Sequence, residues 1–178
     1  MIGPGLRARL IGLALYLLAG LALLLMRLLP VNPGAIGWPG PDWLMALTLA
    51  WVLRRPEQVP AAVIAAVVLV EDLLLMRPPG LGAVLMLLGT EAARNREARW
   101  RDQGFMVEWL RVAVLMGGMM LADRVASILF ILPVPPLGLA ALHLIATVAA
   151  YPVVVLFGRL LLGLRPMTTA EAERLGYR

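Results

Sequence analysis

Five ionisable side chains stand in the outer half of the apolar runs, away from their ends, and they are the residues best placed to do chemistry. They are Glu71, Asp72, Asp123, Arg124 and His143. A carboxylate facing a guanidinium can tie two helices together or hold a charged ligand, and a lone histidine can relay protons. If these runs cross a bilayer, each charge costs a few kcal/mol or more, so such residues are usually paired or functional.

The spacing of these residues predicts one buried polar layer. With about 1.5 Å of rise per residue, all five fall roughly 9 to 13 Å below the outer ends of their predicted helices. We expect Arg124 to pair with Glu71 or Asp72, because otherwise charges would stay unpaired in a low dielectric. Fixing helix register is the simpler role for such a pair, and ligand binding is the alternative. His143 is expected to hydrogen-bond to a nearby carbonyl or carboxylate rather than to relay protons.

Other site chemistries lack their residues. The chain has no cysteine and one histidine, and no carboxylates stand at ligand spacing beside it, so neither a metal site nor a cofactor is expected. The sequence contains no Gly-x-Ser-x-Gly elbow, no phosphate-binding glycine loop and no His-Glu-x-x-His pair. These observations predict a protein that is not an enzyme.

The composition requires a lipid environment for most of the chain. Hydrophobic residues make up 61% of the 178 residues and charged residues 15%, whereas soluble domains average about 45–50% and about 25%. The mean hydropathy is +0.86. So few charges cannot coat a water-facing surface of this size. We therefore predict an all-α polytopic membrane bundle.

Six apolar runs are candidates for membrane crossings, three of them short for the roughly 20 residues that a helix needs to cross. The predicted bundle occupies residues 1–165, with a cytoplasmic loop or short surface helix at about 94–103, and a cytoplasmic tail follows at 166–178. Packing against longer neighbours or local thinning of the bilayer would have to accommodate the short helices. The predicted helices cover residues 8–29, 43–53, 59–76, 81–93, 105–132 and 137–164.

The arginines predict the orientation. All 16 basic residues are arginine, and cytoplasmic loops carry the Lys/Arg excess. Six crossings with both termini cytoplasmic put nearly all of them on one side, where they would contact anionic lipid or a cytosolic partner; short clusters between apolar runs do not suit a nucleic-acid binder. The predicted cytoplasmic contacts are Arg54, Arg55, Arg94, Arg96, Arg99 and Arg101. The predicted outer interface consists of Trp38, Asp42 and Arg77.

Several phrases of the sequence, taken in order, resemble a known family. Gly-Pro-Asp at 40–42 leads through an apolar run to Trp-Val-Leu-Arg-Arg-Pro at 51–56. Asp-Leu-Leu-Leu at 72–75 leads to Arg-Pro-Pro-Gly-Leu at 77–81, and Glu91 precedes the arginine-rich segment. Together they resemble the rod shape-determining membrane protein family MreD, in its alphaproteobacterial form.

The resemblance implies a non-enzymatic component of the bacterial inner membrane. Members of that family belong to the rod (elongation) complex, which directs lateral peptidoglycan synthesis and rod cell shape. The implied partners are the bitopic periplasmic protein MreC, MreB filaments, and the RodA glycosyltransferase with its class B penicillin-binding transpeptidase. The family is also similar in fold to the substrate-binding membrane subunits of energy-coupling-factor vitamin transporters. A small-molecule transporter subunit with a ligand between Glu71, Asp72, Arg124 and His143 is therefore the alternative function.

Overall fold

The all-helical prediction is confirmed by the computed structural model, which describes residues 4–29, 40–100 and 104–161. Each of the six predicted runs forms a helix, and one turn of 3-10 helix joins the second to the third. The elements are α1 (Pro4–Leu28), α2 (Trp43–Arg54), η1 (Pro56–Gln58), α3 (Ala61–Leu74), α4 (Leu81–Trp100), α5 (Phe105–Leu129) and α6 (Leu137–Leu161).

Three of these helices are long and apolar enough to cross a membrane. The qualifying segments are Leu6–Leu28 in α1, Phe105–Leu129 in α5 and Leu137–Leu160 in α6. By contrast, α2 has only 12 residues and α3 only 14, while the second half of α4 carries three arginines and two glutamates. Three candidate spans are thus established by length and composition, fewer than the six predicted crossings.

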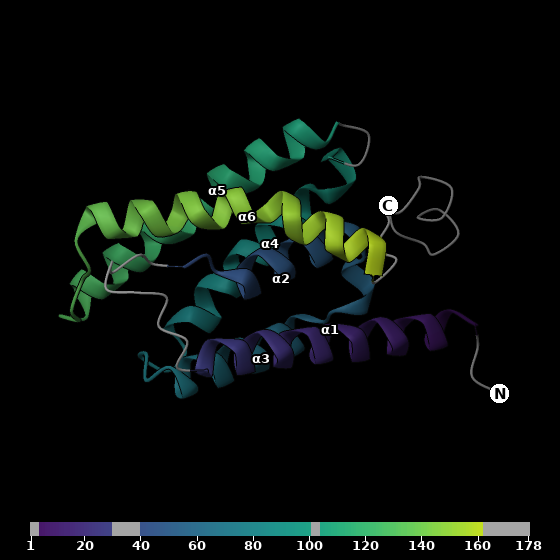
Figure 1. Cartoon of the computed structure of the whole chain (residues 1–178), viewed down its shortest axis with the longest axis horizontal. Coiled ribbons are helices and arrows are strands. Elements are labelled where there is room, and N and C mark those ends of the chain that lie inside the picture. Colours follow the sequence, from purple (N-terminus) through teal and green to yellow (C-terminus); the bar gives the residue numbers. More distant parts are fainter. Residues whose placement is uncertain (1–3, 30–39, 101–103, 162–178) are drawn as a thin grey trace.

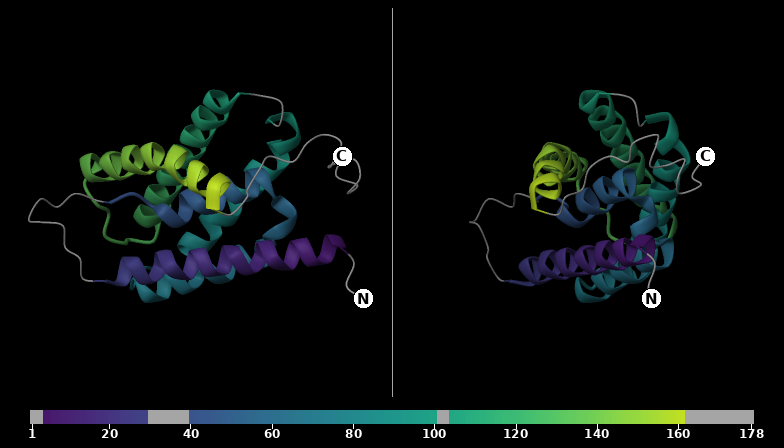
Figure 2. Two further views of the ribbon diagram at one scale, coloured as in Figure 1. Left: turned by 45° about the vertical axis from the view of Figure 1, so that its right-hand side comes forward. Right: turned by 90° about the vertical axis from the view of Figure 1, so that its right-hand side faces the viewer.

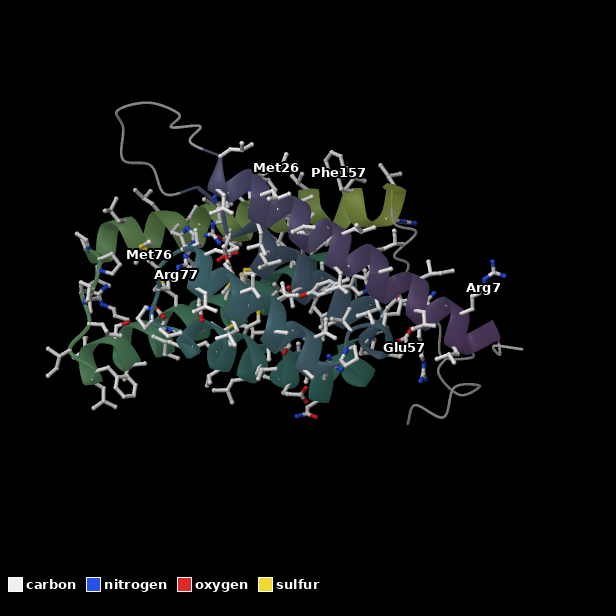
Figure 3. All side chains as sticks on the ribbon, turned by 90° about the horizontal axis from the view of Figure 1, so that it is seen from below. Arg7, Met26, Glu57, Met76, Arg77 and Phe157 are labelled. Carbon is white, nitrogen blue, oxygen red and sulfur yellow. The ribbon has the colours of Figure 1, made fainter. Side chains whose placement is uncertain are left out.

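Successive helices alternate in direction along the long axis of the molecule, as Figure 1 and the two views of Figure 2 show. The beginning of α1 and the end of α6 consequently lie at the same end. Arg7 and Glu57 lie toward this arginine-rich end in Figure 3, and Met76 and Arg77 lie toward the other end. We call the second one the acidic end, because its charged residues include Asp42, Glu71 and Asp72.

The short helix α2 forms the centre of the bundle. Ten of its 12 residues are buried, and it packs between α1, α4 and α6. Asp42 caps its first turn by accepting a hydrogen bond from the Met45 N–H at 3.0 Å, which satisfies one of the free donors at a helix start. Its Trp51 is fully buried and meets the ring of Tyr16 edge to face, 5.6 Å between centroids. A continuous apolar run therefore becomes the core helix rather than a lipid-exposed one.

The helices α3 and α5 end in the same backbone motif, which forms the turn of each hairpin. Met76 (φ 52°) and Ile131 (φ 57°) adopt the left-handed conformation just after α3 and α5. The next N–H in each case reaches back five residues, from Arg77 to the Asp72 carbonyl and from Leu132 to the Ser127 carbonyl, both at 2.8 Å. This is the Schellman arrangement, which usually has glycine at the left-handed position. Prolines follow both turns and prevent the helix from continuing.

The largest difference from the predicted boundaries is at the end of α4, because the predicted loop at residues 94–103 begins as helix. The α4 helix continues from Leu81 to Trp100. Arg94 ties this extension to the rest of the fold by donating hydrogen bonds to the carbonyls of Pro56 (3.1 Å) and Val59. It also pairs with Glu91 one turn earlier, at 3.3 Å. The predicted tail 166–178 lies outside the described residues.

Candidate functional site: two polar clasps at the ends of α2

The acidic end of α2 is held by an ion-pair cluster that joins three helices. Arg27, in the last turn of α1, bonds to the Glu71 carboxylate of α3 and lies 3.7 Å from Asp42 at the start of α2. Glu71 and Asp42 are both buried. One guanidinium therefore offsets two carboxylates that would be costly to bury alone. We call Arg27, Asp42 and Glu71 the acidic-end clasp.

Two residues of α6 extend the attachment of this clasp. Thr147 accepts a hydrogen bond from the Asp42 backbone N–H at 3.0 Å, and it donates to the His143 carbonyl at 2.7 Å. The His143 ring is half-buried, and its Nδ1 lies 2.7 Å from the Gly40 carbonyl. The prediction that His143 bonds to a nearby carbonyl is confirmed. Its partner is the segment that enters α2, so the ring helps to anchor that segment to α6.

Asp72 fastens the α3–α4 turn rather than joining the clasp. Its Oδ2 accepts from the Gly80 N–H at 3.2 Å, and its carboxylate packs against the backbone of Gly82, where an added Cβ would lie 2.5 Å from Oδ1. Asp72 is only 1% exposed. Among the described residues, Oδ1 has no hydrogen-bond partner. Only glycine at position 82 allows α4 to approach this carboxylate so closely.

The predicted pairing of Arg124 is wrong. Arg124 donates a hydrogen bond to the Pro135 carbonyl at 2.8 Å, within the α5–α6 hairpin, and Glu71 is paired with Arg27 instead. Asp123, the residue before Arg124, is exposed rather than buried, and it interacts electrostatically with Arg77 and Asp72. The reason is the bundle order: α1 packs beside α3, so a cation at the end of α1 reaches Glu71. The five predicted residues therefore do not form one buried cluster, because Asp123 is exposed and Glu71, Arg124 and His143 bond to separate partners.

At the arginine-rich end, α2 is held by a second clasp. Arg54, the last residue of α2, lies 2.9 Å from Glu108 of α5, and the Tyr151 hydroxyl of α6 donates to the same Glu108 oxygen at 2.6 Å. Arg54 also donates to the Tyr151 oxygen at 3.4 Å and to the Ala50 carbonyl. We call Arg54, Glu108 and Tyr151 the arginine-end clasp.

This arrangement corrects the prediction that Arg54 is a surface contact for lipid or a partner. Arg54 is 5% exposed, and it bonds to Glu108, to Tyr151 and to the Ala50 carbonyl within the bundle. Glu108 and Tyr151 were not among the predicted site residues. Glu108 stands near the start of the α5 run and resembles an ordinary solvated end residue, and a tyrosine within an apolar run gives no sign of its partner.

The structure describes the side chains of only some of the other arginines predicted to contact lipid or a partner. Arg55 is half-buried and lies 3.9 Å from Glu57, and Arg94 is half-buried against η1. Beside them, Gln58 accepts a hydrogen bond from the Trp51 indole at 3.0 Å and packs on Gly12 of α1. The side chains of Arg96 and Arg99 lie outside the described part of the chain, as do the whole of Arg101 and Trp38.

Of the predicted outer-interface residues that the structure describes, one is buried and one is exposed. Asp42 is buried in the acidic-end clasp, so it is not an exposed interface residue. Arg77 is exposed, as predicted, at the α3–α4 turn. Asp42 faces inward because it serves two partners at once, the N-terminus of α2 and the Arg27 guanidinium.

The chemistry of both clasps is that of helix fixation. In each, a guanidinium is shared between groups from different helices, which is how buried charges are usually accommodated in membrane bundles. Within residues 4–29, 40–100 and 104–161, no group of three or more His, Cys, Asp or Glu side chains is placed to hold a metal ion. Comparisons of the chain with models of protein families, with curated proteins and with solved structures give no match.

Proposed function

We propose that this chain is an MreD-type component of the rod (elongation) complex in the bacterial inner membrane. In this proposal it is not an enzyme, and it scaffolds or regulates lateral peptidoglycan synthesis through its partners. One observation carries the proposal: the phrases that resemble the family contain the residues that fix the bundle. Asp42 and Arg54 begin and end α2 in the two clasps, and Asp72 with Gly80 fastens the α3–α4 turn.

A scaffold needs a rigid arrangement of helices and free surfaces. The two clasps supply the first requirement, because they fix α2 to α1, α3, α5 and α6 through charged groups. Exposed side chains at both ends supply the second. Arg7 and Arg9 are exposed at the arginine-rich end, and Arg77 and Asp123 are exposed at the acidic end.

The proposed topology has six crossings with both termini in the cytoplasm. The alternating helix directions support it, since the start of α1 and the end of α6 share one end (Figure 1). The arginines Arg7, Arg9, Arg55 and Arg159 lie toward that end, as expected for the cytoplasmic side. The acidic end then faces the periplasm.

This orientation assigns a side to each proposed partner. MreC, whose main part is periplasmic, would meet the acidic end with its exposed Arg77 and Asp123. MreB filaments and anionic lipid would meet the arginine-rich end. RodA and its class B penicillin-binding transpeptidase would contact the membrane-embedded flanks of the bundle.

The second candidate, a vitamin-binding transporter subunit of the energy-coupling-factor type, ranks lower. Its ligand was expected between Glu71, Asp72, Arg124 and His143. These groups are engaged separately: Glu71 with Arg27, Arg124 with the Pro135 carbonyl and His143 with the Gly40 carbonyl. Thermal stabilisation of the purified protein by one vitamin in a screen would reverse this ranking.

Co-purification with MreC tests the proposal. The chain and the MreC of the same organism are co-expressed and extracted in mild detergent, and we expect one complex on size exclusion. Arg77→Glu, which inverts an exposed charge at the acidic end, should weaken capture. The matched change Arg9→Glu at the opposite end should not. If the folded wild-type chain fails to capture MreC, the proposal is contradicted.

A further inference from the structure

The acidic end of the bundle is stepped, because its helices differ greatly in length. At about 1.5 Å per residue, α3 spans about 21 Å and α2 about 18 Å, while α5 and α6 each span about 37 Å. A hydrocarbon core is about 30 Å thick. The short helices therefore fall short of a full crossing, and the long ones exceed it.

The two hairpins at the acidic end reach different heights. Asp123 of α5 lies within electrostatic range of Asp72 and Arg77 at the α3–α4 turn. Beyond Asp123, α5 continues to Leu129, a further 9 Å or about six residues at 1.5 Å each. Figure 1 shows the α5–α6 turn lying farther out along the long axis than the α3–α4 turn. We call the α3–α4 turn, with Met76 and Arg77, the shelf.

The projecting part of the α5–α6 hairpin is apolar on its outside. Val125, Ile128 and Leu129 of α5 each expose more than three-fifths of their surface, and Leu137 at the start of α6 is 59% exposed. Such side chains are suited to hydrocarbon, and at about 37 Å each α5 and α6 are long enough to cross its full thickness of about 30 Å. The acyl chains beside α5 and α6 therefore extend beyond the height of Asp123.

The shelf carries a charged side chain, unlike the apolar outside of the α5–α6 hairpin. Arg77 is exposed there, next to Met76, which is 95% exposed. Below the shelf, the outward side chains of α3 are apolar and open, among them Leu69 and Leu73. No described helix of this chain covers them, so a longer neighbour does not bury the short helix.

We propose that the bilayer is locally thinned beside the shelf. Acyl chains cover α3 as far as Leu73, and lipid headgroups and water reach Met76 and Arg77. On the α5–α6 side, hydrocarbon continues past that height. An unthinned bilayer would instead leave the exposed guanidinium of Arg77 within the acyl chains, at the cost that a buried charge carries. Thinning around short hydrophobic segments is an ordinary response to mismatch.

The chain offers a clean test because it contains no cysteine. Single variants Leu73→Cys, Met76→Cys and Ile128→Cys are spin-labelled and reconstituted in dioleoylphosphatidylcholine vesicles. Relaxation by oxygen reports hydrocarbon, and relaxation by a water-soluble nickel chelate reports water. All three positions are exposed, so labelling should leave the fold intact, and size exclusion of each variant checks it. Val125→Cys replaces Ile128→Cys if the latter aggregates.

The expected depth profile is not monotonic along the bundle axis. The Met76 label should relax mainly with nickel, whereas the Ile128 label, farther out, should relax mainly with oxygen, as should the Leu73 label. Oxygen-dominated relaxation at both Met76 and Ile128 would overturn the proposal by showing a bilayer of even thickness. Nickel-dominated relaxation at both would place the hairpin in water. Protection of Met76 from both reagents would show that protein, such as a second copy, covers the shelf.

Discussion

Arg54 and Glu108 are 54 positions apart in the chain, yet their charged groups lie 2.9 Å apart in the bundle. The pair joins the last residue of α2 to the first turn of α5. Tyr151 of α6 completes it through the same Glu108 oxygen. Since α2 has only 12 residues, this contact and the Arg27 cluster at its other end hold a helix too short to be positioned by spanning the bilayer itself.

Removing the carboxylate of the arginine-end clasp should destabilise the bundle strongly. Glu108→Ala leaves the buried Arg54 guanidinium without its ion pair, which is expected to cost about 3 kcal/mol. Tyr151→Phe removes the short hydrogen bond to Glu108 and the longer one from Arg54, keeps the ion pair, and should cost about 1 kcal/mol. Unfolding in detergent titrated with dodecyl sulfate measures both values. Equal effects of the two variants would show that the ion pair adds nothing beyond the hydrogen bonds.

The acidic-end clasp predicts a clear difference between two arginines. Arg27→Gln leaves Glu71 and Asp42 buried without a guanidinium and should cost about 3 kcal/mol. Arg124→Gln loses a bond to one carbonyl within its own hairpin and should cost under about 1 kcal/mol. Thermal unfolding of the two variants in the same detergent compares them. A larger loss for Arg124→Gln would restore the pairing of Arg124 with α3 that the sequence predicted.

Replacing Gly82 with alanine should destabilise the bundle, whereas the same change at Gly118 should not. A methyl group at position 82 would press on the Asp72 carboxylate, 2.5 Å from Oδ1, whereas at position 118 it meets nothing within 4 Å. Gly82→Ala should therefore cost about 2 kcal/mol, while Gly118→Ala should be neutral or stabilising by about 0.5 kcal/mol because alanine favours a helix. The same unfolding assay reports both. Tolerance of Gly82→Ala would mean that α3 and α4 are less tightly joined than described.

Cysteine labelling should show both ends of the bundle on the predicted sides. Arg9→Cys and Arg159→Cys lie at the arginine-rich end, and Gly138→Cys lies at the acidic end in the first turn of α6. A membrane-impermeant maleimide applied to spheroplasts should label only Gly138→Cys, and the other two should react after lysis. Reaction of Arg9→Cys and Arg159→Cys from opposite sides would exclude an even number of crossings.

The sequence was sufficient to predict the helices because the apolar runs and their Pro/Gly breaks are local signals. Trp43, Leu81, Phe105 and Leu137 begin helices as predicted. The extension of α4 past Arg94 was not predicted, because its stability comes from η1, whose carbonyls Arg94 binds. A local pattern of charged residues cannot reveal such a partner.

Pairing of the charges was much harder to predict, because it depends on which helices are neighbours. Depth along a helix placed Arg124 near Glu71, but Arg27 reaches Glu71 because α1 packs beside α3. The type of partner was predicted correctly for His143, since any nearby backbone carbonyl can accept a hydrogen bond from its ring. The buried Arg54 was predicted to be a surface residue because arginine clusters at the ends of runs normally face water or lipid headgroups.

Rescue of cell shape tests the proposed function most directly. A rod-shaped bacterium depleted of its MreD and MreC receives this chain together with the MreC of the chain's own organism, and cell width and length are measured by microscopy. We predict that rods return with the wild-type chain and fail to return with Arg27→Gln. Round cells despite folded wild-type protein in the inner membrane would contradict the assignment to the rod complex.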